Sequence, residues 1–269
     1  MIMALFLGIC VGLILGITGS GGAILAVPIL LFGLDLPPKV AIPMSLMAVA
    51  LSSSIGALSA LKSGHLRYKA VSLIAISGMV IAPLGVWLGN LLPNQPLMII
   101  FAFALLYIGY ITLFKKERER APLLDESIDA LPCEMNPKLG KLHWTKRCAQ
   151  ALALTGGITG FLSGLLGVGG GFVIIPAIRK FSNIPMKQIV PTSLGVIAII
   201  STFSLILFIL TDRLMWNIAI PFSLGSVAGM LTANHFRSKI NNHRIAKIFA
   251  IFLVIIAPLL IYKASFYVY

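Results

Sequence analysis

Two clusters of glycines interrupt long apolar stretches of this sequence, and they are the residues best placed to do chemistry. The first cluster begins at Gly19 and is closed by Pro28; the second begins 148 residues later at Gly167 and is closed by Pro176. Clustered glycines break a helix and let the backbone approach a ligand closely. The helix that restarts after each break presents unpaired N–H groups and the positive end of its dipole. We therefore expect an anion site at the breaks.

Hydroxyl groups beside the breaks are the next candidates. Thr18 and Ser20 flank the first glycine, whereas the second break has Leu166 and Val168 at the matching positions, so we expect the two sites to differ. Two further serines near the starts of later spans are weaker candidates for pore lining, because serines in membrane helices usually bond to their own backbone. The predicted substrate-binding set is Thr18, Gly19, Ser20, Gly21, Gly22, Ser45, Gly167, Gly169, Gly170, Gly171 and Ser193.

Close helix packing is the competing explanation for glycines in membrane helices. We prefer it for Gly12 and Gly16 and for their counterparts Gly160 and Gly164, whose spacing presents one small face. The two longer clusters suit a break better, since packing does not need several glycines in a row. A phosphate-binding P-loop does not fit, because neither cluster precedes a Lys-Ser/Thr pair or follows a predicted strand.

Carboxylates are scarce in the apolar parts of the chain. Outside 115–148 they are Asp35 and Asp212, both in predicted external loops. A buried cation site or proton relay needs a carboxylate at membrane depth, and acid–base or metal catalysis needs clustered His, Cys or acidic side chains. The three cysteines form no C-x-x-C pair, and we do not expect a disulfide framework. The sequence thus predicts neither an enzyme nor a metal or cofactor site.

The composition is that of a membrane protein. The 269 residues are 58% hydrophobic and 11% charged, with a mean hydropathy of +1.00, whereas soluble domains carry about 25% charged residues. The apolar runs approach the ~20 residues that cross a bilayer. The net charge of +13 comes mainly from short loops, which is typical of topology determinants rather than of nucleic-acid binding. Because the N-terminal run recurs in the second half, we expect mature structure there and not a cleaved signal peptide.

The 148-residue interval continues far beyond the glycine clusters. Pro43 matches Pro191, and Phe101 matches Phe249. An interval preserved over this length predicts two homologous halves. The predicted units are a first transmembrane repeat at 1–114, a polar cytoplasmic linker at 115–148 and a second transmembrane repeat at 149–269.

Loop charges favour one of two topologies. If each glycine-broken element crossed the membrane once, both halves would have the same orientation, and the basic loop at 236–247 would lie outside. If each element is a hairpin that enters and leaves on one side, the second half is inverted and all basic loops lie inside, as the positive-inside rule requires. Inverted repeats with broken helices are a recurring transporter plan. We therefore predict an all-α polytopic membrane protein of two inverted repeats, each with a glycine-broken helical hairpin and three transmembrane helices.

The second cluster carries a family resemblance. The run Gly167-Val-Gly-Gly-Gly-Phe-Val-Ile-Ile-Pro176, together with its first-half copy, resembles the duplicated motif of the sulfite exporter (TauE/SafE) family; the copy departs at Ala23, where the motif has a third glycine. The resemblance covers both halves and excludes the linker. It implies transport of small sulfur oxyanions or organosulfonates, often outward and coupled to an ion gradient.

These observations lead to one functional hypothesis with two alternatives. We expect a secondary transporter, and by resemblance an exporter, of a small anion bound at the paired breaks; the alternatives are a passive anion channel and a membrane assembly factor without transport. The expected partners are the anion and the lipid bilayer, with a coupling ion and self-association as further candidates and no nucleic acid. We place the protein in a bacterial-type inner (plasma) membrane with its linker in the cytoplasm.

Overall fold

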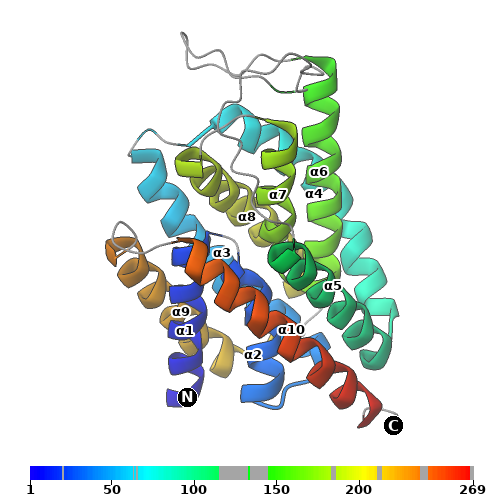
Figure 1. Ribbon diagram of the computed structural model, residues 1–269. Helices are drawn as coiled ribbons and strands as arrows, with labels where there is room; N and C mark the ends of the chain where they lie inside the picture. The colour runs from blue at the N-terminus through cyan, green and yellow to red at the C-terminus, as the bar shows by residue number, and fades with distance from the viewer. Residues whose placement is uncertain are drawn as a thin grey trace.

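The structure is a computed structural model, and it describes residues 1–19, 21–62, 64, 66–114, 133, 145–182, 186–210, 214–236 and 242–266. These ranges contain ten α-helices, whose arrangement is drawn in Figure 1. The first five are α1 (Ile2–Thr18), α2 (Gly21–Gly33), α3 (Pro38–Lys62), α4 (Tyr68–Leu91) and α5 (Asn94–Phe114). The second five are α6 (Lys146–Leu166), α7 (Gly171–Phe181), α8 (Met186–Ile209), α9 (Trp216–Phe236) and α10 (Asn242–Phe266).

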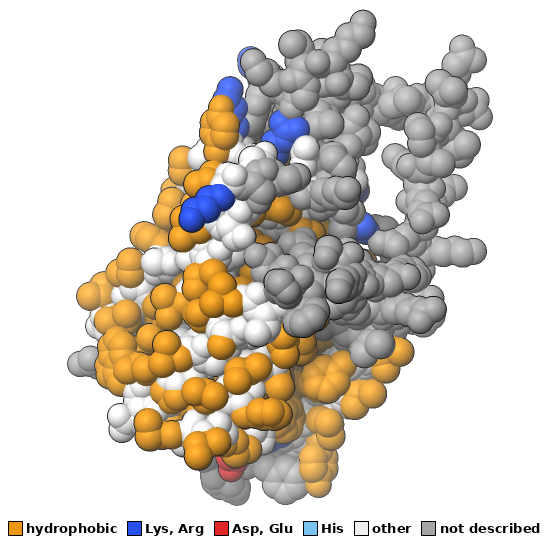
Figure 2. Space-filling model, turned by 90° about the vertical axis from the view of Figure 1, so that its left-hand side faces the viewer, with side chains coloured by type: hydrophobic (Ala, Val, Ile, Leu, Met, Phe, Trp, Pro, Cys, Tyr) orange, Lys and Arg blue, Asp and Glu red, His pale blue; other side chains and the backbone are white. Residues whose placement is uncertain are grey.

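The molecule has the helices and the surface of a multi-pass membrane protein, as predicted. Among the described residues, six helices are long and apolar enough to cross a membrane: α3, α4, α5, α6, α8 and α9. Large apolar side chains such as Val80, Trp87 and Phe103 are mostly exposed, which suits contact with lipid. Figure 2 shows hydrophobic side chains over the middle and lower parts of one face, with Lys and Arg side chains towards the upper end.

Equivalent helices recur at a constant interval, and the two sets of five are interlocked. Helices α8, α9 and α10 each begin 148 residues after α3, α4 and α5. Helix α1 packs along α9, and α6 packs along α4, so the first helix of each set lies against the fourth helix of the other. Helices α3 and α8 pack against each other, as do α5 and α10. In Figure 1, α1 rises from the N-terminus at the lower end, whereas α6 descends from the upper end.

Glycines make the closest of these helix contacts. A Cβ atom on Gly12 of α1 would collide with the carbonyl oxygen of Ser226 in α9, and one on Gly160 of α6 would collide with the carbonyl oxygen of Gly78 in α4. The two collisions involve matching positions of the two sets. Backbones that approach this closely gain van der Waals contact along the whole helix pair. The packing role predicted for Gly12 and Gly160 is therefore confirmed.

Each glycine-broken element folds back on itself. Gly22, near the start of α2, lies against Leu15, and Gly33, at the end of α2, lies against the side chain of Leu7. Helix α2 therefore returns along α1 and does not continue in its direction. Gly170, at the start of α7, lies against Thr159 of α6 in the same manner. Both elements are thus hairpins of the chain. Helix α6, the first arm of the second hairpin, is itself one of the six helices long enough to cross a membrane, which the prediction of three spans beside each hairpin did not include.

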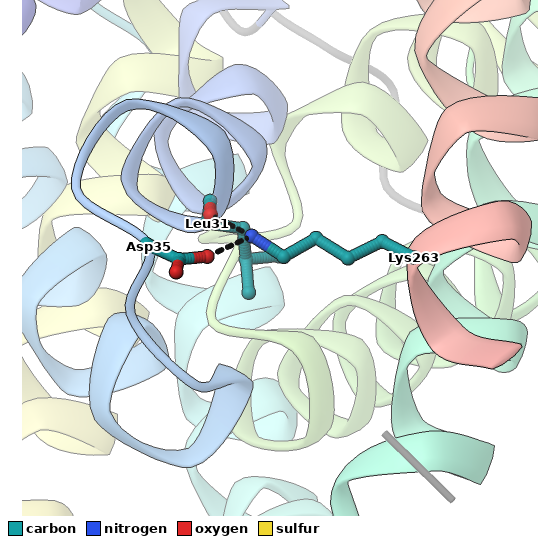
Figure 3. A network of polar contacts seen from close by, with 3 residues as sticks. All are labelled: Leu31, Asp35 and Lys263. Carbon is teal, nitrogen blue, oxygen red and sulfur yellow. Dashed lines mark hydrogen bonds and ion pairs between the residues drawn. The ribbon is translucent and has the colours of Figure 1, made fainter. Parts of the chain in front are cut away.

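A lysine from the last helix contacts the carboxyl end of α2, in the first hairpin (Figure 3). Lys263 Nζ of α10 donates to the carbonyl oxygen of Leu31 at 2.6 Å and to the Asp35 carboxylate at 2.5 Å. A cation at the carboxyl end of α2 also interacts favourably with the helix dipole. Asp35 is the one carboxylate in the described part of the chain. The contact ties α10 to the end of α2 opposite the break.

A disulfide joins Cys133 to Cys148, a pair that the expectation of no disulfide framework left out. Cys148 lies in the first turn of α6, and the Cα atoms of the two residues are 4.9 Å apart. The backbone N–H of Cys133 donates to the carbonyl oxygen of Phe181 at the end of α7, which holds Cys133 beside α6. The sequence gives no sign of the disulfide, because the pairing depends on the contact of Cys133 with the end of α7. The remainder of 115–144 lies outside the described residues.

Candidate functional site

Both breaks begin with the same backbone turn. Helix α1 ends at Gly19, which has φ of 76° and donates its N–H to the carbonyl oxygen of Leu15 at 2.7 Å. Helix α6 ends at Gly167, which has φ of 70° and donates to Ser163 at 2.9 Å. A left-handed residue at this position terminates a helix, and glycine adopts it without steric cost. The predicted helix breaks are therefore present at both clusters.

The second break leads into a helix whose start is buried and has no side-chain cap. Gly169 and Gly170 both have φ of 66°, and Gly170 is the N-cap of α7 with no side-chain hydrogen bond to the first turn. Both glycines are buried. By contrast, the exposed start of α6 is capped by Thr145, whose hydroxyl accepts from the N–H of Cys148. A buried helix start normally needs such a partner. The N–H of Val173 donates to the carbonyl oxygen of Gly170 at 3.0 Å, so the N–H groups of Gly171 and Phe172 and the helix dipole are what can hold an anion.

Each break is hydrogen-bonded by a serine from the opposite set of helices. Ser45 Oγ of α3 donates to the carbonyl oxygen of Gly167 at 2.8 Å, and Ser193 Oγ of α8 donates to that of Gly19 at 3.3 Å. The two bonds join matching positions, and both serines are fully buried. The predicted site residues Ser45, Ser193, Gly19 and Gly167 thus lie together as two equivalent pairs.

The hydroxyl groups expected at the first break are placed differently. Thr18 Oγ1 donates to the carbonyl oxygen of Ile14 at 2.6 Å, within its own helix. Ser20 lies outside the described residues. Gly21 begins α2, and Gly22 packs on Leu15. Gly171 begins α7 and is buried. The described hydroxyl at the first break therefore serves its own helix.

Two buried hydroxyls at the second break were not among the predicted residues. A Cβ atom on Gly169 would lie 2.7 Å from Ser201 Oγ of α8, and one on Gly170 would collide with the side chain of Thr159 of α6. Both hydroxyl residues are fully buried. Ser201 has a weak sequence signal, since it matches Ser53 in the first half. Thr159 has none, because the first half carries an apolar residue at its position.

The surroundings of the second break are neutral and largely apolar. The nearest atoms to a Cβ on Gly169 include methyl groups of Ile197 and Val49, and Gly167 lies against Ile42. Among the described residues no group of three or more His, Cys, Asp or Glu could hold a metal ion. Hydrogen-bond donors in such apolar surroundings act strongly on a bound charge, because water does not screen it.

Comparisons with known proteins agree on a transporter family. The family model described as "Sulfite exporter TauE/SafE" matches residues 4–260. A "Probable membrane transporter protein" of Xylella fastidiosa (strain 9a5c) is 27% identical over 94% of this chain and 92% of its own length. The "Probable membrane transporter protein YunE" of Bacillus subtilis is 24% identical over 98% of both chains.

A third relative, from Methanocaldococcus jannaschii, is also named a probable membrane transporter protein, and it is 30% identical over 87% of this chain and 85% of its own. No solved structure matches the chain significantly. The family model spans both sets of five helices, including both glycine breaks. The chain therefore belongs to the sulfite exporter TauE/SafE family of membrane transporters.

Proposed function

We propose that this protein is a secondary transporter, operating as an exporter, of a small anion such as a sulfur oxyanion or an organosulfonate. The family supplies the transporter class. The observation that supports an anion as the substrate is the start of α7. This helix start is buried, lacks a side-chain cap and follows three left-handed glycines. No carboxylate among the described residues lies near either break, so a bound anion meets donors and no repelling charge.

Ser45 and Ser193, which bond to glycines of the opposite set of helices, suit a site whose two breaks move. A hydroxyl group has one proton to donate, and each serine has two acceptors within reach. Ser45 reaches the carbonyl oxygens of Ile42 at 2.7 Å and Gly167 at 2.8 Å. Ser193 reaches Val190 at 2.8 Å and Gly19 at 3.3 Å. Either break can therefore move away from its serine while the hydroxyl stays bonded to its own helix. We propose that the two sets of helices rock in this way to give alternating access.

We propose an inverted topology with the basic ends of the helices in the cytoplasm of a plasma membrane. The opposite directions of α1 and α6 in Figure 1 support the inversion. Lys62 ends α3, Lys69 lies in the first turn of α4, and Arg179 lies in the last turn of α7. Figure 2 shows the Lys and Arg side chains of one face gathered towards the upper end, as the positive-inside rule requires. In this arrangement the 115–148 linker is cytoplasmic. The proposed role is transport without an enzymatic activity.

Flux in proteoliposomes tests this function. Purified protein is reconstituted, and uptake of sulfite, thiosulfate, sulfate and methanesulfonate is followed under imposed proton and sodium gradients. We expect saturable uptake of at least one anion and its accumulation against a concentration gradient. Flux that only equilibrates the anion under every imposed gradient would indicate a passive channel. Absence of flux from folded protein that retains a bound partner protein in mild detergent would indicate an assembly factor.

A further inference from the structure

We propose that Ser201 and Thr159 bind the transported anion at the second break, together with the N–H groups of Gly171 and Phe172 at the start of α7. This inference rests on the proposed function and assigns the substrate to one of the two breaks. It makes Ser201 of α8 and Thr159 of α6 positioning residues for substrate. Neither residue belongs to the glycine motif itself.

The hydroxyl of Ser201 departs from the behaviour of its neighbours. Ser53, its counterpart in α3, donates to the carbonyl oxygen of Val49 at 2.5 Å, and Thr202 donates to that of Ala198 at 2.7 Å. Ser201 Oγ is fully buried and has no hydrogen-bond partner among the described residues. It is directed at Gly169, since a Cβ there would lie 2.7 Å from it. A buried hydroxyl without a partner is costly, so it is expected to have a ligand.

Thr159 supplies a second hydroxyl of the same kind. Its Oγ1 is buried and unpartnered within the described part of the chain, whereas Thr155, one turn earlier, donates to the carbonyl oxygen of Ala151 at 2.7 Å. Its side chain packs against Gly170, the uncapped N-cap of α7. The Ser201 hydroxyl, the side chain of Thr159 and a helix start thus lie beside the same two glycines, with the methyl group of Thr159 nearest to Gly170. Because all of these groups can donate hydrogen bonds, they fit a ligand rich in acceptors, such as an oxyanion.

Among the residues that the structure describes, the first break lacks this arrangement. The position that matches Thr159 is Val11, and the hydroxyl that matches Ser201 is already bonded within its helix. Val11 is fully buried and offers no donor. We therefore assign the anion to the second set of helices. This places the asymmetry of the site in the second half, whereas the sequence placed the extra hydroxyls in the first.

The test compares Ser201→Ala and Thr159→Val with Ser53→Ala, a matched control in which a buried hydroxyl is lost from the equivalent helix. Uptake of sulfite, thiosulfate, sulfate and methanesulfonate is measured in proteoliposomes. For any anion that the wild type carries, we expect KM to rise roughly tenfold or more in each of the two site variants, as loss of a hydrogen bond to a charged group predicts. The control is expected to keep the wild-type KM. Ser201→Thr, which retains a hydroxyl group, is expected to have a KM close to that of the wild type.

Thermal unfolding distinguishes binding from a structural role. Without anion, Ser201→Ala is expected to unfold at or above the wild-type temperature, since it removes an unpartnered buried hydroxyl. The stabilisation produced by the transported anion is expected to fall. Unchanged KM in both site variants, or a lower unfolding temperature of Ser201→Ala without anion, would overturn the assignment and leave the proposed function intact. A wild type that carries none of the four anions would overturn the proposed function and this assignment with it.

Discussion

At the scale of single residues, the breaks are held by bonds that each half makes to the other. Ser45 and Ser193 lie at matching positions and reach Gly167 and Gly19, respectively. A buried carbonyl that loses its donor keeps the cost of its desolvation. The glycines turn the chain, and the serines fix where the turn lies. The two serines therefore position the breaks.

Removal of these hydroxyls is expected to destabilise the protein. Ser45→Ala should lower the free energy of unfolding by roughly 1 kcal/mol, and Ser193→Ala should cost less, because its bond to Gly19 is longer. The control is Ser54→Ala, whose hydroxyl donates to Ala50 in its own helix. Thermal unfolding of the purified variants in detergent gives the comparison. Equal stability of Ser45→Ala and Ser54→Ala would show that the bond to Gly167 contributes nothing.

At the scale of helices, the fold depends on two glycine contacts that repeat between the sets. Gly12 brings α1 onto α9, and Gly160 brings α6 onto α4. These contacts fix each hairpin to a long helix of the other set. The breaks can keep their positions only if the hairpins stay packed in this way.

A larger residue at such a contact is expected to prevent folding. Gly160→Leu should separate α6 from α4, because even its Cβ would collide with the backbone of Gly78. Gly195→Ala is the control for substitution of a buried helical glycine, since its Cβ would meet only side-chain methyl groups, the nearest at 3.2 Å. Size-exclusion chromatography in detergent should show a monodisperse peak for the control and aggregated or absent protein for Gly160→Leu. A monodisperse Gly160→Leu protein with wild-type unfolding temperature would contradict the packing role.

The sequence predicts the helices and the breaks well, because local chemistry and a repeated interval determine them. Glycine clusters end α1 and α6 where expected, and Gly12 packs as its spacing indicated. The contacts across the molecule could not be predicted. The bond from Ser45 to Gly167 joins residues 122 positions apart. Thr159 has an apolar counterpart in the first half, so comparison of the two halves does not indicate a role for it. Such contacts depend on the interlocking of the two sets, which no local pattern records.

At the scale of the whole molecule, the proposed topology makes a claim about the cysteines. Cys133 and Cys148 form a disulfide, but thiols in the cytosol are kept reduced. If the linker is cytoplasmic, the pair is expected to be a dithiol in the cell and to oxidise after isolation. Cys10 has no disulfide partner and serves as an internal reference.

Thiol trapping in cells measures this state. Cells that express the protein are quenched in acid, denatured and labelled with a maleimide polymer that shifts the band once per free thiol. We expect all three cysteines to be labelled, as they are in a reduced control sample. Labelling of Cys10 alone would show that the disulfide persists in the cell, which would contradict a cytoplasmic linker.

If a small anion passes the second glycine break, matched variants of two left-handed glycines should differ in anion flux. Gly170→Ala and Gly64→Ala both place alanine at a left-handed residue, with φ of 66° and 69°, at a similar backbone cost of about 1 kcal/mol. A Cβ on Gly170 meets Thr159 at the break, whereas one on Gly64 meets nothing within 4 Å. The measurement is anion uptake by equal amounts of folded protein in proteoliposomes. We expect Gly64→Ala to keep wild-type flux and Gly170→Ala to lose at least about nine-tenths of it; equal flux in the two variants would contradict passage of the anion at the second break.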